Sequence, residues 1–135
     1  MKKYIFKIVI AVFPFFTVYS QSDTVCNPSF EDSLNSWGII NNGSSVSTLS
    51  ISSDSLYSGN LGLIYDVSYV NPPSSSCALT SCMLSLQQGN YYKISFWAKS
   101  DSSESLLVVL QPTSAPFTNY ASKTFVTSTN WQQYI

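Results

Sequence analysis

The chain is predicted to be an all-β protein, on three observations. Apolar residues alternate with Ser and Thr over short runs such as residues 46–52 and 58–67. Clusters of Gly, Pro, Asn and Ser separate these runs and are typical of turns. No segment has the apolar repeat of three to four residues that an amphipathic helix needs. About seven short strands joined in this way predict a β-sandwich or barrel.

Each predicted strand is bounded by turn residues, as Gly89-Asn90 bounds two of them. Residues 105–111 are a more continuous apolar run, which is expected of a strand covered on both faces. In residues 91–99 the alternation places Phe96 in the core and Trp97 on the opposite face. The predicted strands span residues 46–52, 58–67, 82–88, 91–99, 105–111, 120–127 and 131–135.

Residues 1–20 are predicted to be a secretory signal peptide. Three lysines open the chain, residues 8–18 are almost entirely apolar, and Ser20 stands where signal peptidase reads a small residue. This apolar run is shorter than the roughly 20 residues that cross a bilayer. We therefore expect cleavage before Gln21, export of residues 21–135 as one domain, and no membrane span in the mature protein. The alternative is an anchor that stays uncleaved.

Charge and composition exclude one class of partner. Without the leader, three lysines stand against seven acidic residues, which gives a net charge of about −4. The chain has no arginine and no basic patch, so binding to a phosphate backbone has no electrostatic basis and no nucleic-acid partner is expected. Abundant Ser, Thr, Asn and Tyr are typical of a secreted or cell-surface β-protein.

Export permits a disulfide among the three cysteines. Cys77 and Cys82 are close enough in sequence to bridge residues 77–82, and this pair is the predicted disulfide. A straight strand through residues 78–81 would hold the two sulfur atoms too far apart, so pairing of Cys26 with either cysteine is the alternative. Three scattered cysteines without histidine do not make a zinc site.

Four segments occur in an order that resembles the carbohydrate-binding modules of families 4, 9, 16 and 22. They are NPSFEDSLNSW (27–37), SLYSGNLGLIYDV (55–67), LQQGNYYKISFWAKS (86–100) and STNWQQYI (128–135). The resemblance implies a galactose-binding-domain-like jelly roll, a β-sandwich of two antiparallel sheets, over nearly all of the mature chain. The chain stops at Tyr134-Ile135 inside a predicted strand, so the final strand or strands of such a module are expected beyond it.

The same resemblance implies a structural calcium site. In such modules the Glu of the N-x-x-F-E opening contributes to the site together with an Asp from the final strand. Glu31, with Asn27, fits the first role, whereas the Asp has no counterpart in this chain. Calcium takes six to eight oxygen ligands, of which these residues supply only a part. The alternative is that Glu31 accepts hydrogen bonds from backbone N–H groups at a strand start.

No catalytic arrangement can be assembled from the chain. Glu31 and Asp32 are adjacent, so on an extended chain they point to opposite faces and cannot flank a glycosidic bond. The other carboxylates fall in separate turns and strands, and there is no histidine to activate Ser or Cys. The chain alone is therefore predicted to be non-catalytic.

The aromatic and polar side chains favour carbohydrate binding instead. Sugar rings stack their C–H faces on flat aromatic rings, and their hydroxyls need polar partners. Trp97 is the main candidate, because an outward tryptophan is either covered by a loop or offered as a platform. The resemblance implies packing roles for Trp37 and Trp131, beside Phe30 and Phe125. The predicted ligand-binding residues are Trp97, Tyr91, Lys93, Ser95, Gln111 and Tyr120.

The sequence therefore predicts an exported, non-catalytic module that binds a polysaccharide or oligosaccharide. Such a module holds a covalently linked downstream domain, for example a glycoside hydrolase, near its substrate. The alternative is a structural or adhesive β-sandwich of a secreted or cell-surface protein without a sugar site, because this fold serves many unrelated functions. The two differ in whether Trp97 and Tyr91 lie exposed together in a groove or are covered by residues 68–77.

Overall fold

A computed structural model describes the backbone of residues 2–9 and, with side chains, residues 25–54, 56–70 and 77–135. All regular structure in these residues is β-strand, and every strand pair is antiparallel. The predicted all-β fold is therefore confirmed. The described part of the chain contains no helix that would cross a membrane. The strands are β1 (Lys2–Val9), β2 (Gly38–Asn41), β3 (Val46–Ser52), β4 (Gly62–Tyr69), β5 (Cys77–Thr80), β6 (Ser95–Ser100), β7 (Ser105–Leu110), β8 (Ala121–Val126) and β9 (Gln132–Tyr134).

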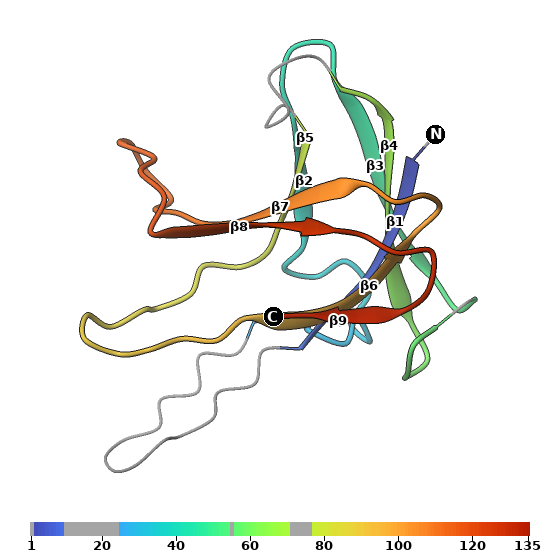
Figure 1. The fold of residues 1–135 in the computed structure, drawn as a ribbon, viewed down its shortest axis with the longest axis horizontal. Coiled ribbons are helices and arrows are strands. Elements are labelled where there is room, and N and C mark those ends of the chain that lie inside the picture. The colour runs from blue at the N-terminus through green and yellow to red at the C-terminus, as the bar shows by residue number, and fades with distance from the viewer. Residues whose placement is uncertain (1, 10–24, 55, 71–76) are drawn as a thin grey trace.

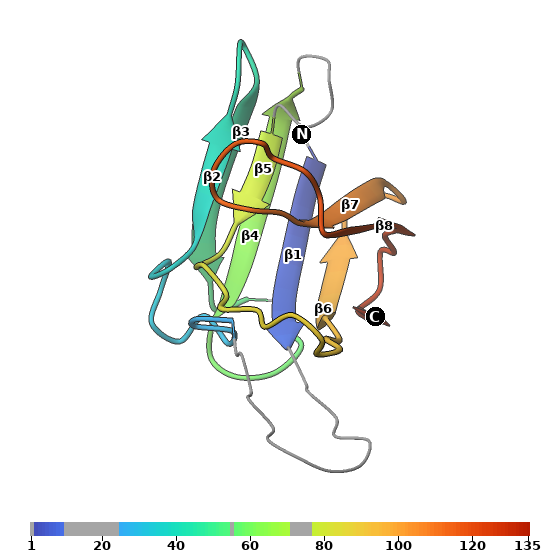
Figure 2. The ribbon, with the colours of Figure 1, turned by 90° about the vertical axis from the view of Figure 1, so that its left-hand side faces the viewer.

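The strands form two layers, as a β-sandwich requires. Five of them make one sheet in the order β3-β4-β1-β6-β9 (Figure 1). The pairs β2–β5 and β7–β8 cover one face of this sheet (Figure 2). Ile39 and Leu79 of the first pair, and Leu106 and Phe125 of the second, pack against the buried core. The second layer thus consists of two separate pairs, where a single sheet was predicted.

Alternation along β4 and β6 builds the core. From Leu63 to Val67 every second residue of β4 is buried, while the residues between them are half-buried. Phe96 of β6 is buried on the same inner side, and its ring lies 5.3 Å from that of Tyr134 and 5.7 Å from that of Phe125. Burial of these large apolar surfaces supplies the main driving force for closing the two layers.

The predicted strand at residues 82–88 is wrong. That segment has the alternating pattern but pairs with no strand among the described residues, and it leads into a turn where the Asn90 N–H donates to the Gln87 carbonyl (3.3 Å). The paired strand in this region is instead β5, residues 77–80, which is hydrogen-bonded to the four-residue β2. An alternating pattern makes a strand only where a partner strand is available to accept its backbone hydrogen bonds.

Part of the predicted leader occupies the middle of the large sheet. β1 lies between β4 and β6 and is antiparallel to both. The first strand pair matches residues 2–6 with 63–67, and the second matches residues 4–9 with 95–100. Residues 10–24 lie outside the described residues, so the predicted cleavage before Gln21 stays a prediction. Cleavage there would remove β1 from the sheet.

Candidate functional site

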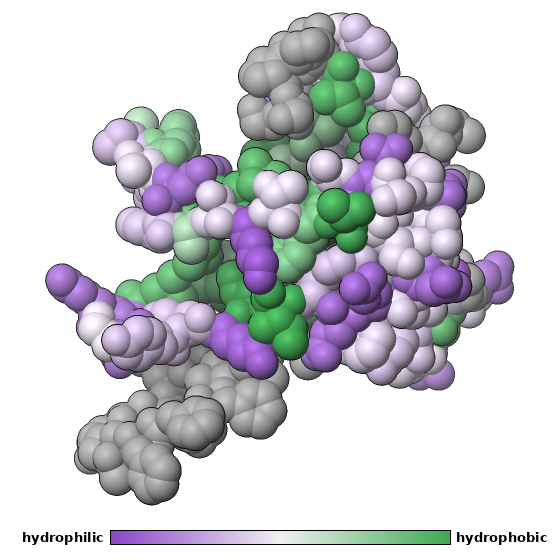
Figure 3. All heavy atoms as spheres, in the orientation of Figure 1, coloured by the Kyte–Doolittle hydropathy of each residue, from purple (hydrophilic) through white to green (hydrophobic). Residues whose placement is uncertain are grey.

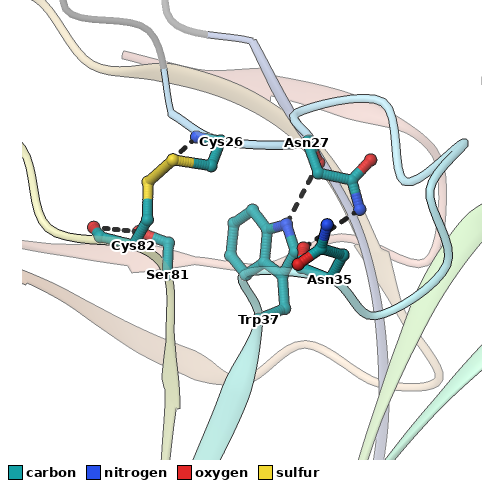
Figure 4. Close-up of a disulfide and its surroundings, with 6 residues drawn as sticks. All are labelled: Cys26, Asn27, Asn35, Trp37, Ser81 and Cys82. Atoms are coloured by element: carbon teal, nitrogen blue, oxygen red, sulfur yellow. Dashed lines mark hydrogen bonds between the residues drawn. A yellow bond between two sulfur atoms is a disulfide. The ribbon is translucent and has the colours of Figure 1, made fainter.

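The opening motif of the domain is a succession of turns held by the Asn27 side chain. Its Nδ2 donates to the carbonyls of Ser33 (2.8 Å) and Asn35 (3.1 Å), and its Oδ1 accepts from the Asp32 N–H (3.1 Å). The Trp37 Nε1–H donates to the Asn27 carbonyl (3.0 Å; Figure 4). Both ends of the Asn27 amide are therefore committed to the turn.

These turns require backbone that few residues adopt. Phe30 has a φ of 64° and is fully buried, and its ring lies 5.2 Å from that of Trp37. Left-handed backbone is unfavourable for a bulky residue, so the packing and the Asn27 hydrogen bonds must hold Phe30 in place. The predicted packing of Trp37 beside Phe30 is confirmed. The other non-glycine residues with positive φ are Asn27, Ser33 and Ser36.

Glu31 fastens this motif to the turn that precedes β4. Its Oε1 accepts from the Asn60 N–H (2.8 Å) and the Leu61 N–H (3.3 Å), and its Oε2 from the Asn60 Nδ2 (3.3 Å). These are charge-assisted bonds to a strand start, which is the role that the alternative interpretation gave to Glu31.

Glu31 and Asn27 do not fit a calcium site. The carboxylate oxygens of Glu31 face N–H donors, and the amide oxygen of Asn27 faces the Asp32 N–H. Calcium needs six to eight oxygens that point at the ion. Across the described residues, no group of three or more His, Cys, Asp and Glu side chains is arranged to hold a metal ion. We therefore assign both side chains to the turn.

The predicted disulfide between Cys77 and Cys82 is wrong. The bond joins Cys26 to Cys82, with 5.9 Å between their Cα atoms (Figure 4). Cys77 opens strand β5, and an extended chain rises about 3.3 Å per residue, which carries Cys82 well beyond bridging distance. Cys77 is a half-buried free thiol whose Sγ lies within hydrogen-bond distance of Asn41 Oδ1 (3.4 Å). The alternative pairing with Cys26 is the one observed.

Trp97 lies on the outer face of the large sheet, on the side away from the core. It is half-buried, because the ring of Tyr57 stacks on it with centroids 3.9 Å apart and planes at 15°. Trp131 joins them, 5.8 Å from Tyr57, and Lys99 lies over the Trp131 ring at 5.5 Å. Tyr57, in the β3–β4 connection, thus covers one face of the Trp97 ring. Most of the 68–77 segment that was predicted as an alternative cover lies outside the described residues.

The predicted packing of Trp131 beside Phe125 is wrong. Tyr134 takes that place, with its ring 5.4 Å from that of Phe125. Tyr134 is buried, and Trp131 lies three residues earlier, before β9 begins, where it meets Tyr57 and Lys99. A motif with two aromatic residues near one short strand does not by itself say which of them enters the core.

The remaining predicted ligand-binding residues lie in three places. Tyr91 and Lys93 are exposed in the segment 81–94 that leads into β6, and Gln111 and Tyr120 are exposed where the β7–β8 connection begins and ends. Ser95 is only 2% exposed and cannot reach a surface ligand. The structure therefore separates Trp97 from the other four exposed or half-buried candidates.

The segments 81–94 and 111–120 project from the same side of the molecule (Figure 1). The space-filling view shows a hollow between them (Figure 3). Tyr91 is 98% exposed and Tyr120 is 70% exposed, so both rings are accessible from solvent. Sugar rings need such accessible aromatic faces together with polar hydrogen-bonding groups.

Two aromatic residues near these surfaces were not among the sequence candidates. Phe117, which is 61% exposed, lies in the 111–120 segment just after the cis peptide bond between Ala115 and Pro116. Tyr57 is the other, and its contact with Trp97 spans 40 positions in the sequence. Both residues lie between predicted strands, and alternation gives no information on a side chain outside a strand.

Comparison with known proteins gives the family. No curated protein and no solved structure shows a significant match to the chain. A family model described as a carbohydrate binding domain, of the family 4 and 9 type, matches residues 22–135. That span excludes the predicted leader and includes the turn motif, both projecting segments and the aromatic residues described above. The chain therefore belongs to this family of non-catalytic carbohydrate-binding domains.

Proposed function

We propose that this domain binds a polysaccharide or oligosaccharide in the hollow between residues 81–94 and 111–120. Family membership supplies the ligand class. The observation that carries the location is the exposure of Tyr91 and Tyr120 on the two segments that border the hollow. Lys93 and Gln111, exposed on the same segments, are the nearby polar groups that would meet sugar hydroxyls.

The expected affinity is modest. A stacked ring contributes about 0.5–1.5 kcal/mol beyond area burial, and a neutral hydrogen bond contributes about as much net. Immobilising the ligand and the exposed side chains opposes these gains. A weak module is nevertheless effective when it is linked to another domain, because it raises the local concentration of that domain at a polymeric substrate.

The experiment is retention on a panel of β-glucan, xylan and mannan by affinity electrophoresis. We expect Tyr91→Ala and Tyr120→Ala each to weaken binding about tenfold, since each removes one stacking surface. Tyr57→Ala is the matched control on the outer face of the large sheet, and the thermal midpoint of each variant reports on folding. Failure of the wild type to bind any glycan contradicts the proposed function.

The outer-face cluster is the second candidate location. There Tyr57 covers one face of the Trp97 ring, so a sugar would meet Tyr57 or displace it. A loss of binding in Tyr57→Ala or Trp97→Ala, with Tyr91→Ala unaffected, would move the site to that face.

A structural or adhesive role is the second candidate function. The observation that favours it is the same cluster, in which the Tyr57 ring packs against the rings of Trp97 and Trp131. Under this alternative the protein would bind no glycan on the panel.

Export by the amino-terminal segment and linkage to a glycoside hydrolase complete the proposal. The family match starts at residue 22, one residue after the expected mature start. Expression of the full chain with its leader, followed by mass analysis of the secreted product, tests cleavage before Gln21. A hydrolase domain encoded in the same reading frame would identify the substrate class.

A further inference from the structure

The turn between β2 and β3, at the top of Figure 1, carries the one Asn-Gly pair of the sequence, Asn42-Gly43. The Ser45 N–H donates to the Asn42 carbonyl (3.2 Å), so Gly43 and Ser44 are the central residues of a β-turn. Asn42, Gly43 and Ser44 are all exposed, and Gly43 has a φ of 62°. The Asn42 side chain is therefore accessible to water and is followed by a residue that has no side chain.

The side-chain amide of Asn42 has no hydrogen-bond partner among the described residues, in contrast to that of Asn41. The Asn41 Nδ2 donates to the Ser47 carbonyl (3.1 Å), and its Oδ1 accepts from the Ser47 Oγ (2.6 Å). The Gly43 N–H likewise donates to no other residue in the described part of the chain. The carbonyl carbon of one side chain and the backbone nitrogen beside it are thus both left available for reaction.

These two atoms can react with each other. The Gly43 nitrogen attacks the Asn42 Cγ, a five-membered succinimide ring closes, the Cγ–Nδ2 bond breaks, and ammonia leaves with the proton of the Gly43 amide. Attack within one dipeptide is favoured over an encounter of two molecules, and the missing Cβ of glycine leaves room for the approach. Water then opens the ring. Opening at Cγ gives aspartate, and opening at the backbone carbonyl gives isoaspartate.

We propose that Asn42 is a modification site, at which the folded domain deamidates spontaneously to aspartate and isoaspartate with water as the co-reactant. Asparagine is among the chemically labile residues of proteins. Either product adds a negative charge to the turn, and isoaspartate also lengthens the backbone between β2 and β3 by one carbon. The inference goes beyond sugar binding and depends on neither the glycan nor export.

Two other asparagines are controls within the same chain. Asn60 and Asn90 are also exposed, but each follows a glycine and precedes a large residue, Leu61 and Tyr91. A side chain on the following residue obstructs the approach of its nitrogen, and the Leu61 N–H already donates to a carboxylate (3.3 Å). We therefore expect Asn42 to convert at least about tenfold faster than Asn60 or Asn90.

The experiment incubates the full chain, folded and freshly purified, in neutral buffer. Ion-exchange chromatography and peptide mass mapping follow the conversion, and Asn42→Asp marks where the acidic form elutes. We expect the acidic form to accumulate with both aspartate and isoaspartate at position 42. Asn42→Gln is the matched variant, because glutamine would have to close a larger ring. It is expected to fold with an unchanged thermal midpoint and to stay unconverted at position 42 over the same period.

Three results would overturn the proposal. Intact Asn42 in the folded protein, with conversion in a urea-unfolded sample, would show that the fold protects the turn. Aspartate without isoaspartate would show direct hydrolysis without the ring. Conversion of Asn90 as fast as that of Asn42 would show that the Asn-Gly turn has no part in the reaction. The turn lies apart from the segments 81–94 and 111–120 (Figure 1), so glycan retention of the same samples tests the proposed function independently.

Discussion

Gly59 and Glu31 depend on each other at the scale of single residues. Gly59 has a φ of 81°, and a Cβ there would lie 2.6 Å from the Glu31 Oε1. Only glycine allows both this backbone and the close approach of the carboxylate. The carboxylate in turn accepts hydrogen bonds from the amides of Asn60 and Leu61. One exposed side chain thus links two segments that are 29 to 30 positions apart in the sequence. The N-x-x-F-E opening and the Ser58-Gly59 pair are the two halves of this contact.

We predict that Gly59→Ala destabilises the domain more than Gly89→Ala does. Gly89 also has a positive φ, 88°, but a Cβ there meets nothing within 4 Å, so its substitution costs only the backbone term of about 1 kcal/mol. At Gly59 the new methyl group must also push Glu31 away from its amides, which adds about 1–2 kcal/mol. Urea denaturation measures both values.

The double variant Gly59→Ala, Glu31→Ala completes a double-mutant cycle that measures the interaction between the two residues. It is expected to be less destabilised than the sum of its single variants, because the second substitution removes the atom that the first one hits. Asp54→Ala, at an exposed carboxylate, is the control and should change stability by less than about 0.5 kcal/mol. Strict additivity of the two substitutions would contradict the contact.

At the scale of elements, the sequence pattern predicted β3, β4, β6 and β9 of the large sheet and the β7–β8 pair, but not β1, whose residues were assigned to the leader. β3 has its predicted bounds, and β4, β6 and β7 begin and end within four residues of theirs. The β2–β5 pair was missed because each strand has only four residues, too few to carry a pattern. The segment 82–88 was overpredicted because a sequence pattern does not reveal whether a partner strand is present.

The candidate site was harder to predict from the sequence, because it depends on contacts between segments that are distant in the chain. The position of Trp97 opposite the core follows from local alternation, but its cover by Tyr57 is a contact between distant segments. The pairing of Cys26 with Cys82 spans 56 residues, and three cysteines allow three pairings that spacing alone does not separate. Exposure of Tyr91 and Tyr120 depends on loops that have no periodicity.

We predict that Cys26→Ser lowers the free energy of unfolding by about 2–4 kcal/mol. The bond closes a loop of 56 residues, and a loop of that length restricts the unfolded chain substantially. Cys82→Ser should have the same effect, and Cys77→Ser a small one, because the hydroxyl can replace the thiol beside Asn41. Chemical denaturation under non-reducing conditions gives the values. A titration of free thiols in the unfolded wild type should find one; three would show that the bond does not form.

At the scale of the whole molecule, residues 21–135 carry little charge and no arginine. Lys93 is the cation on the segments that border the hollow, and a neutral glycan offers it no ion pair. We therefore predict that the dissociation constant for a neutral polysaccharide changes by less than about twofold between 0.05 and 0.5 M NaCl, a range over which exposed ion pairs are screened. Isothermal titration or affinity electrophoresis at the two salt concentrations measures this. A steep loss of binding at high salt would indicate an anionic ligand.

The disulfide also decides how the domain responds to mechanical force. A pull on the carboxyl-terminal side first extends the strands after residue 82, and the load then passes through the sulfur atoms to residue 26. The chain between the two cysteines bears no tension, although a sequence separation of 56 would otherwise lengthen by about 190 Å at ~3.4 Å per residue. The turn motif and β2 to β5 lie inside this shielded loop, so this half of the sandwich keeps its shape under shear when an attached polymer drags on the rest.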